Sequence, residues 1–308
     1  MKRKRSTPFP SRLASDPLRW AIATVLLAPV GALAEGIVPQ AGPAGTPQVE
    51  QHGATALINI VPPVNGTSHN QYLGYDVGAG GAVLNNATAA GQSALLGELG
   101  ANPQFNGAAA GMIINEVVGN AGSYINGPQE IFGQAADYVL ANPNGIHING
   151  GRLINAPQSA FLVGTPEVVD GRLVGLNTFD AAGHVQVDGA GLASDGAVRL
   201  IAPRVDTNGQ MDLPGEATVI AGRNRVAPGG EILETRQGGE QAIDAQLLGA
   251  MKAGRIESDQ HTRGRRCAPG QRRFHRRRRH RRRLRRLAGY WRHTIANAPG
   301  RRRRQRRT

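Results

Sequence analysis

The chain has 308 residues, 42 of them glycine, and a formal net charge of +14 at pH 7. Glycine usage is roughly twice the average of about 7%, and aromatic residues make up only 4%. This composition disfavours a compact enzyme core built on large rings. It favours thin layers of Val, Ile, Leu and Ala between turns, as in a narrow stacked coil.

The positive charge is not spread evenly along the chain. Residues 1–34 hold six Lys and Arg against one acid, a net charge of +5. Residues 35–256 hold nine Lys and Arg against 19 acids, a net charge of −10, and residues 257–308 hold 21 Arg against two acids, a net charge of +19. Only the middle segment has the composition of a folded domain.

The N-terminus has the three regions of a secretory signal peptide. A basic leader precedes an apolar run at residues 20–30, and a small-x-small motif, Ala32 to Ala34, stands before Glu35. We therefore predict that residues 1–34 are a signal peptide, handled by the general secretion machinery and cleaved before Glu35. The alternative, a transmembrane anchor, needs about 20 apolar residues. No apolar run of the chain reaches that length.

The middle segment is built from short apolar runs between turn residues. Asn-Gly, Asp-Gly and Gly-Gly pairs separate the runs, which is typical of β-strands joined by tight turns. The predicted strands are residues 56–61, 81–84, 112–118, 123–125, 130–132, 138–140, 146–148, 153–154, 160–163, 168–169, 185–187, 197–201 and 217–220. No segment before residue 240 has a helical period. Residues 242–252 are expected to form one short helix or a capping loop.

These strands are arranged either in a β-solenoid or in a β-sandwich. Most are shorter than the five or six residues usual in sandwiches, and they recur at about twenty-residue spacing between residues 115 and 220. Asn is as frequent as Gly in the turns, and stacked Asn side chains can satisfy the backbone of neighbouring turns. The pattern favours the solenoid, with the sandwich as the alternative.

One turn stands out, Asn142-Pro143-Asn144-Gly145-Ile146. Pro143 fixes its own φ and Gly145 permits a positive φ, while Ile146 begins the next apolar strand. The sequence therefore predicts a tight turn that sets the register of the central strands.

Several spaced motifs resemble one family. The run 71–86 resembles the start of the two-partner-secretion (haemagglutination activity) domain of filamentous haemagglutinins and contact-dependent growth-inhibition exoproteins. Asn102-Pro103-Gln104 resembles the family's first Asn-Pro-Asn-Leu motif, but it departs at the third and fourth positions. Asn142 to Ile146 matches the second motif completely. Residues 219–225 and 242–256 resemble the closing segments, so that the resemblance covers about residues 36–256.

The resemblance implies an all-β fold, a right-handed parallel β-helix with extra capping strands at its N-terminal end. It implies a secretion domain at residues 35–230 that closes at 231–256. An outer-membrane barrel transporter would recognise this domain through its periplasmic part and export the chain to the cell surface. The motif residues would then be Asn102, Pro103 and residues 142–146. The alternative, that the second motif is only a stabilising turn, stays open.

The family includes adhesins, haemolysins and growth-inhibition exoproteins, whose effector regions lie far downstream. The resemblance therefore implies a role in adhesion or intercellular competition, with a host or neighbouring-cell surface as a further partner. The one cysteine, Cys267, lies outside residues 35–256. This fits a chain that crosses a second membrane unfolded, because a disulfide would obstruct a narrow pore.

Signals for chemistry are weak. The histidines of the middle segment, His52, His69, His147 and His184, lack ligand spacing to another His or Cys. The glycine run 78–81 lacks the Lys of a phosphate loop. We expect no enzyme activity, no cofactor and no metal site. His147 alternates with Ile146 and Ile148 and should point away from the apolar face.

The Arg-rich segment, residues 257–308, is predicted to be disordered. Its arginines could bind phosphates, so a secreted nucleic-acid-binding protein is the alternative function. However, the segment contains no Lys, and the resemblance ends at Ile256. Both features favour a shifted reading frame and a truncated exoprotein, with no nucleic acid as a partner.

Overall fold

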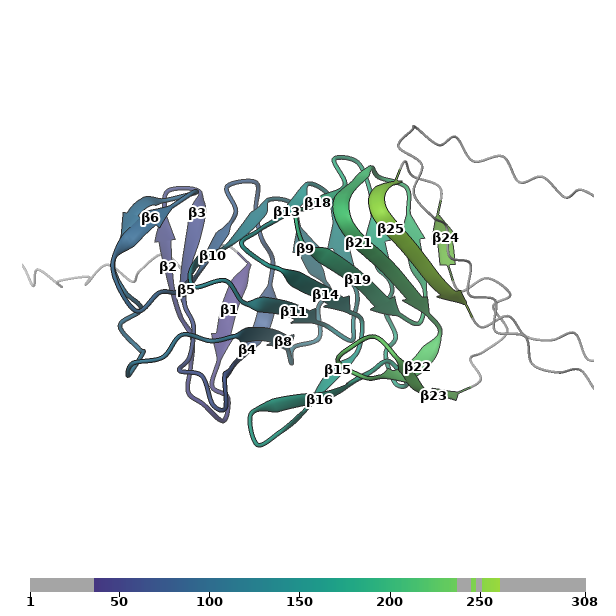
Figure 1. Cartoon of the computed structure of the whole chain (residues 1–308), viewed down its shortest axis with the longest axis horizontal. Coiled ribbons are helices and arrows are strands. Elements are labelled where there is room, and N and C mark those ends of the chain that lie inside the picture. The colour runs from purple at the N-terminus through teal and green to yellow at the C-terminus, as the bar shows by residue number, and fades with distance from the viewer. Residues whose placement is uncertain (1–35, 237–244, 248–250, 261–308) are drawn as a thin grey trace, which may run out of the picture. The chain divides into compact units, whose positions relative to one another are not determined.

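The computed structural model describes residues 36–236, 245–247 and 251–260. Ala32, Ala34 and Glu35, the predicted cleavage residues, lie outside the described residues, as does most of the Arg-rich segment. Signal cleavage and tail disorder therefore stay predictions. Every regular element among the described residues is a β-strand (Figure 1).

Parallel strands form three ladders around a common interior. The first ladder contains β3 (Thr55–Asn59), β5 (Ala82–Asn86), β10 (Pro128–Gly133), β13 (Gly151–Ile154) and β18 (Leu192–Ser194). The second contains β4 (Thr67–Tyr75), β8 (Met112–Val117), β11 (Asp137–Ala141), β14 (Gln158–Leu162) and β19 (Ala197–Ala202). The third is a five-stranded sheet of β9 (Ser123–Ile125), β12 (Ile146–Ile148), β17 (Val185–Val187), β20 (Val205–Thr207) and β24 (Ala245–Leu247).

The first two ladders join into one 14-stranded sheet through a long bent strand. The start of β21 (Met211–Ala221) pairs with β18, and its later residues pair with β19. β25 (Met251–Gln260) then runs parallel to β21 along both parts. Each coil visits the three ladders in turn, as β10, β11 and β12 do. This arrangement is the expected right-handed parallel β-helix, and the parallel pairing rules out the sandwich.

Side chains alternate between the inside and the outside of the coil, as the strand period of two requires. Ile58, Leu84 and Ile131 are register partners in the first ladder and lie in the buried core. Asn side chains also stack within the strands, where Asn85 Nδ2 of β5 donates to Asn59 Oδ1 of β3 in the preceding coil at 3.0 Å.

The outer sides of two ladders are covered by insertions. A hairpin of β6 (Gly91–Ser93) and β7 (Gly97–Leu99) packs its leucines on Val83 and Phe132 of the first ladder. The carboxylate of Glu130 holds this hairpin, since it accepts hydrogen bonds from Ser93 Oγ at 2.7 Å and from the Ala94 N–H at 2.8 Å.

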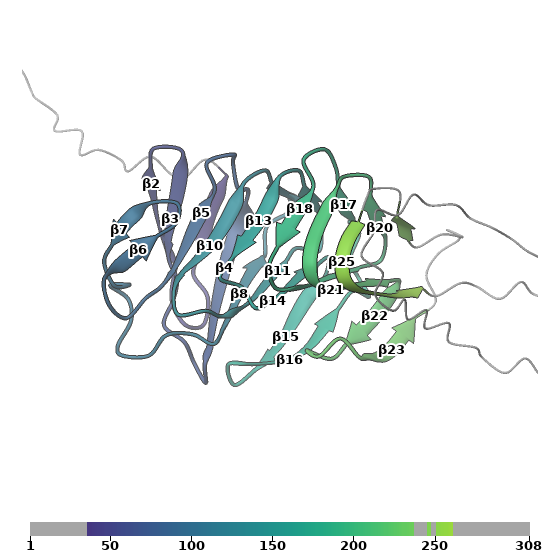
Figure 2. The same cartoon turned by 45° about the horizontal axis from the view of Figure 1, so that its top comes forward.

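A four-stranded antiparallel sheet covers the outer side of the second ladder (Figure 2). Its strands are β15 (Thr165–Val169), β16 (Arg172–Asn177), β22 (Arg223–Val226) and β23 (Ile232–Arg236). At the N-terminal end, β1 (Ile37–Gln40) pairs antiparallel with β4, and β2 (Gln48–His52) pairs antiparallel with β3. These are the expected capping strands.

All of the predicted strands overlap observed strands, but other observed strands were not predicted. Among them, β4 and β22 are rich in polar residues and lack the apolar runs by which strands were identified. The short helix expected within residues 242–252 is wrong, since residues 245–247 and 251–260 are strands. These strands extend the third ladder and the 14-stranded sheet, and pairing with β20 and β21 decides their conformation.

Candidate functional site

The second Asn-Pro motif forms the corner between β11 and β12. The side chain of Asn142 is fully buried. Its Nδ2 donates to the Ala121 carbonyl at 2.9 Å and to Ser123 Oγ at 3.0 Å, and its Oδ1 accepts the Asn144 N–H at 2.9 Å. The amide therefore closes its own turn and also binds the corner of the preceding coil.

Asn144 repeats this double role. Its Nδ2 donates to the Gly119 carbonyl at 2.9 Å and to Asn142 Oδ1 at 3.1 Å. The two side-chain amides thus bind the corner at residues 119–123. Each amide binds a carbonyl of the preceding corner, Ala121 for Asn142 and Gly119 for Asn144, so the two side chains hold the stacked corners together.

The following coil contacts the other side of the turn. The Pro143 carbonyl accepts the N–H groups of Ala182 and Gly183 at 3.2 and 3.1 Å. The N–H of Ile146 donates to the His184 carbonyl at 3.1 Å. Gly145 has a φ of 124°, which a residue with a side chain rarely adopts, and Ile146 lies in the buried core. The motif is therefore the middle layer of three stacked corners.

The first motif forms a similar turn at a different corner, between the first and second ladders. Asn102 is 3% exposed, and its Nδ2 donates to the carbonyls of Ile60 at 2.9 Å and Asn85 at 2.7 Å. Its Oδ1 accepts the Gln104 N–H at 2.9 Å. Gln104 Nε2 reaches the Asn59 carbonyl, so Gln at the third position still binds a preceding strand. Pro103 is exposed.

The two motifs do not meet in one site. Each contacts its own neighbouring coils, and no hydrogen bond between them is found in the part of the chain that the structure describes. Their partners, chiefly Ser123, Asn85 and Gly183, were not predicted from the sequence. Nothing in the sequence signals which corner stacks on which.

The outer side of the third ladder carries an aromatic row beside the second motif. The rings of Tyr124 and His147 stack with centroids 4.9 Å apart, and His184 meets His147 edge-on at 5.6 Å. His147 points away from the buried Ile146 and Ile148, as predicted. Within the described residues, no group of three or more His, Cys, Asp or Glu is placed to hold a metal.

A partly buried carboxylate lies on the outer side of the second ladder. Glu116 Oε2 accepts hydrogen bonds from His69 Nε2 at 2.8 Å and from Gln71 Nε2 at 3.0 Å. Burial raises the pKa of Glu116, but these hydrogen bonds and the charge on the His69 ring outweigh it, so that the pKa lies below the ordinary 4.5. A lowered folded pKa gives stability above the unfolded pKa that is lost as the pH falls through the folded pKa.

Glu116→Gln should therefore flatten the acid dependence of stability. From about pH 6 to about pH 3, the unmodified chain should lose more free energy of unfolding than the variant does. Urea unfolding at several pH values in this range checks the prediction. Glu98→Gln, at an exposed carboxyl, should behave like the unmodified chain. Equal acid dependence of the Glu116 variant and the unmodified chain would contradict the prediction.

Comparisons with known proteins identify the family to which the coil belongs. Residues 36–271 match the family model of the TPS (two-partner secretion) secretion domain. The chain belongs to the TPS secretion-domain family. The TPS match continues past Ile256, where the resemblance noted in the sequence ends, and β25 likewise continues to Gln260. As a TPS exoprotein, the chain is secreted across the outer membrane to the cell surface or the medium.

The TPS domain is similar to a small part of much longer proteins. It is 42% identical over 233 residues to a hemolysin of Proteus mirabilis, covering 75% of this chain and 15% of that protein. It is 39% identical over 206 residues to the tRNA nuclease CdiA of Yersinia mollaretii, covering 65% of this chain and 7% of that protein. The chain thus spans a small part of these relatives. Their names refer to the full-length proteins.

The fold also matches a solved TPS domain. The crystal structure of a filamentous hemagglutinin secretion domain superposes with a TM-score of 0.65 at 31% identity, over 72% of this chain and 78% of that one. The TPS domain is a secretion signal without a catalytic role of its own. In the described part of the chain, no helix is long and apolar enough to cross a membrane.

Proposed function

We propose that this TPS domain is recognised in the periplasm by an outer-membrane barrel transporter, which exports the chain for adhesion or intercellular competition. The observation that carries the proposal is the burial of the motif. Asn142 is inaccessible once its corner has stacked on the preceding one. A partner that binds this side chain must therefore do so before the coil closes, while the segment is still extended.

Folding of the coil outside the cell supplies direction to this export. The periplasm has no ATP, so another source of free energy is needed. An extended segment can add its strands to a sheet edge of the transporter through main-chain hydrogen bonds. Once outside, each coil docks on the one before it and avoids a new nucleation step, and the folded coils cannot slip back through the pore.

In this proposal the motif serves export twice. While extended, Asn142 and Asn144 present free amides to the transporter. After export, the same amides bind the 119–123 corner and set the register of the central coils. A second surface, on a host or neighbouring cell, is the target of the exported chain.

An export assay on Asn144→Ala separates recognition from stabilisation. The measurement is the fraction of chain that reaches the medium or cell surface when the transporter is produced with it. Asn86→Ala is the control, because the Asn86 amide likewise binds neighbouring backbone, at the Ala110 and Gln134 carbonyls, and is even more deeply buried, yet it lies outside the motif. Both variants should lose about 1–3 kcal/mol of stability. Only Asn144→Ala should lose most of its export.

Two results would count against the proposal. Export of Asn144→Ala that equals export of Asn86→Ala would reduce the motif to a stabilising turn. Export that does not depend on any barrel transporter would remove the recognition step itself.

A further inference from the structure

Two insertions that are far apart in the sequence build one sheet across the coils. β15 and β16 are inserted after β14, whereas β22 and β23 are inserted after β21. In the second ladder β19 lies between β14 and β21, so the pairing of β16 with β22 passes over a complete intervening coil. We infer that this four-stranded sheet, here called the strap, couples coils that do not touch and closes only when β22 and β23 are in place.

Main-chain contacts hold the two insertions together. Leu176 pairs with Val226, and Asn177 pairs with Arg225. Beyond these pairs, the Thr178 N–H donates to the Asn224 carbonyl at 2.9 Å, and the Asn224 N–H donates to Thr178 Oγ1 at 2.7 Å. Thr178 and Asn224 are both fully buried. The junction is therefore dry, and opening it leaves buried polar groups without partners.

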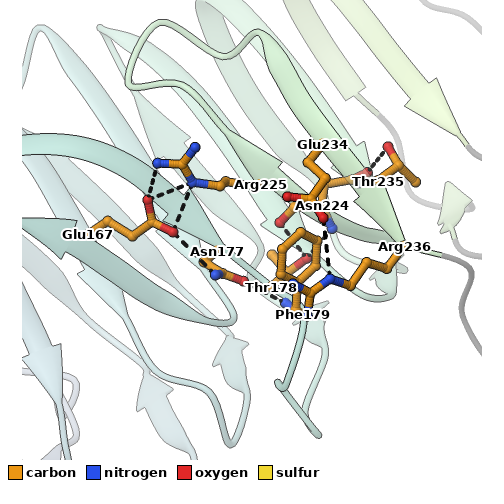
Figure 3. Close-up of polar contacts among 9 residues, drawn as sticks. All are labelled: Glu167, Asn177, Thr178, Phe179, Asn224, Arg225, Glu234, Thr235 and Arg236. Atoms are coloured by element: carbon orange, nitrogen blue, oxygen red, sulfur yellow. Dashed lines mark hydrogen bonds and ion pairs between the residues drawn. The ribbon is translucent and has the colours of Figure 1, made fainter.

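Charged side chains reinforce the junction from outside (Figure 3). The Arg225 guanidinium contacts both carboxylate oxygens of Glu167, with Nη2 at 2.6 Å from Oε2 and Nε at 3.0 Å from Oε1. Asn177 Nδ2 donates to the same carboxylate at 3.2 Å. On the other side, the Arg236 guanidinium lies 3.8 Å above the ring of Phe179. The Glu167–Arg225 and Phe179–Arg236 pairs each join one insertion to the other.

The strap is also fixed to the coils that it crosses. Arg199 of β19 donates to the Pro228 carbonyl in the β22–β23 turn at 2.7 Å. At the far end, Asn65 Nδ2, just before β4, donates to the Asp170 carbonyl in the β15–β16 turn at 2.7 Å. Beneath the strap, its apolar side chains pack on the outward residues of the second ladder. The buried cluster contains Leu176 and Val226 from the strap and Ile114, Val139, Ala141, Ala160, Leu162, Ile201 and Ile220 from the ladder.

This geometry changes how the coils respond to opening. In a simple solenoid each coil contacts only its neighbours, so coils can fray one at a time. The strap links β14 and β21 directly and covers Ile201 between them. The intervening coil therefore cannot open unless the strap opens. The consequence for export rests on the proposed function. The coils of the second ladder become coupled by the strap only after residues 223–236 have left the transporter pore.

Hydrogen exchange of the purified full chain tests the coupling without any transporter. Thr178→Val removes the hydroxyl that joins the insertions and keeps the side-chain volume. Amides of β19 and of the second half of β21 should exchange on the order of tenfold faster. Arg225→Gln, a milder change at a half-exposed side chain, should give a smaller increase in the same strands.

Matched controls lie in the crossed coil itself. Thr207→Val makes the same chemical change at a buried hydroxyl for which the structure shows no hydrogen-bond partner. Arg204→Gln removes an Arg–carboxylate pair, with Asp206, whose Arg side chain is as exposed as that of Arg225. Neither control should speed exchange in β19 by more than about twofold.

Faster exchange confined to β16, β22 and β23 would overturn the inference, because the strap would then be a passive cover. If Thr178→Val does not fold, Arg225→Gln decides alone, and equal exchange of β19 in Arg225→Gln and Arg204→Gln would overturn it too. The export assay on Asn144 is independent of this outcome, so the strap and the recognition proposal can fail separately.

Discussion

Replacing Asn142 by Ala should lower the free energy of unfolding by about 3 kcal/mol. The variant loses the bonds to Ala121 and Ser123 and the bond that closes its own turn at Asn144. Because the side chain is fully buried, its removal leaves Ser123 Oγ, which is also fully buried, without this partner inside the stacked corner. Denaturant unfolding of the purified chain measures the loss.

Asn126→Ala is the control for this variant. Asn126 follows β9 and its side chain is exposed, so the substitution should change stability by less than about 0.5 kcal/mol. A loss at Asn142 as small as that at Asn126 would mean that the stacked corners do not depend on the motif, and the register role would have to be abandoned.

Gly183→Ala should destabilise the same corner from the opposite side, by about 2–4 kcal/mol. A Cβ at residue 183 would lie 2.3 Å from the carbonyl carbon of Asn144 and 2.3 Å from the nitrogen of Gly145. Both are backbone atoms, so no side-chain rotation can relieve the overlap. The two corners must separate, and the Gly183 N–H then loses the Pro143 carbonyl. Thermal unfolding of the purified variant checks this expectation.

Gly78→Ala is the matched control for Gly183→Ala. No atom lies within 4 Å of a Cβ built at Gly78, and the residue is exposed, so the change should stay within about 0.5 kcal/mol. If Gly183→Ala were as stable as Gly78→Ala, the residue 183 corner would not pack on the motif as the structure shows.

These two sites also illustrate what could be predicted from sequence. The tight turn at residues 142–146 follows from Pro143 and Gly145, whose backbone preferences are local. Gly183 carries no such signal, because the reason for glycine there is the backbone of a corner some forty residues earlier. Close approach between segments is a tertiary fact that no local pattern encodes.

The sequence by itself determined where most strands lie and that they stack in coils. Alternation such as that of Ile146, His147 and Ile148 depends only on the period of two in an extended chain, and Asn and Gly mark where each run must turn. The family motifs then indicated a two-partner-secretion domain. All of this information is local, and so one chain is enough to find it.

Only the tertiary structure decided what covers the outside of the coil. Val139 and Ala141 point outward, yet both are buried, because the strap packs over them. A strand that is apolar on both sides shows that something covers it, but not which segment. β22 has only one apolar residue. It is a strand because β16 offers it an edge, and β22 in turn offers an edge to β23. Pairing between segments so far apart depends on the folded coil, which brings their ends together.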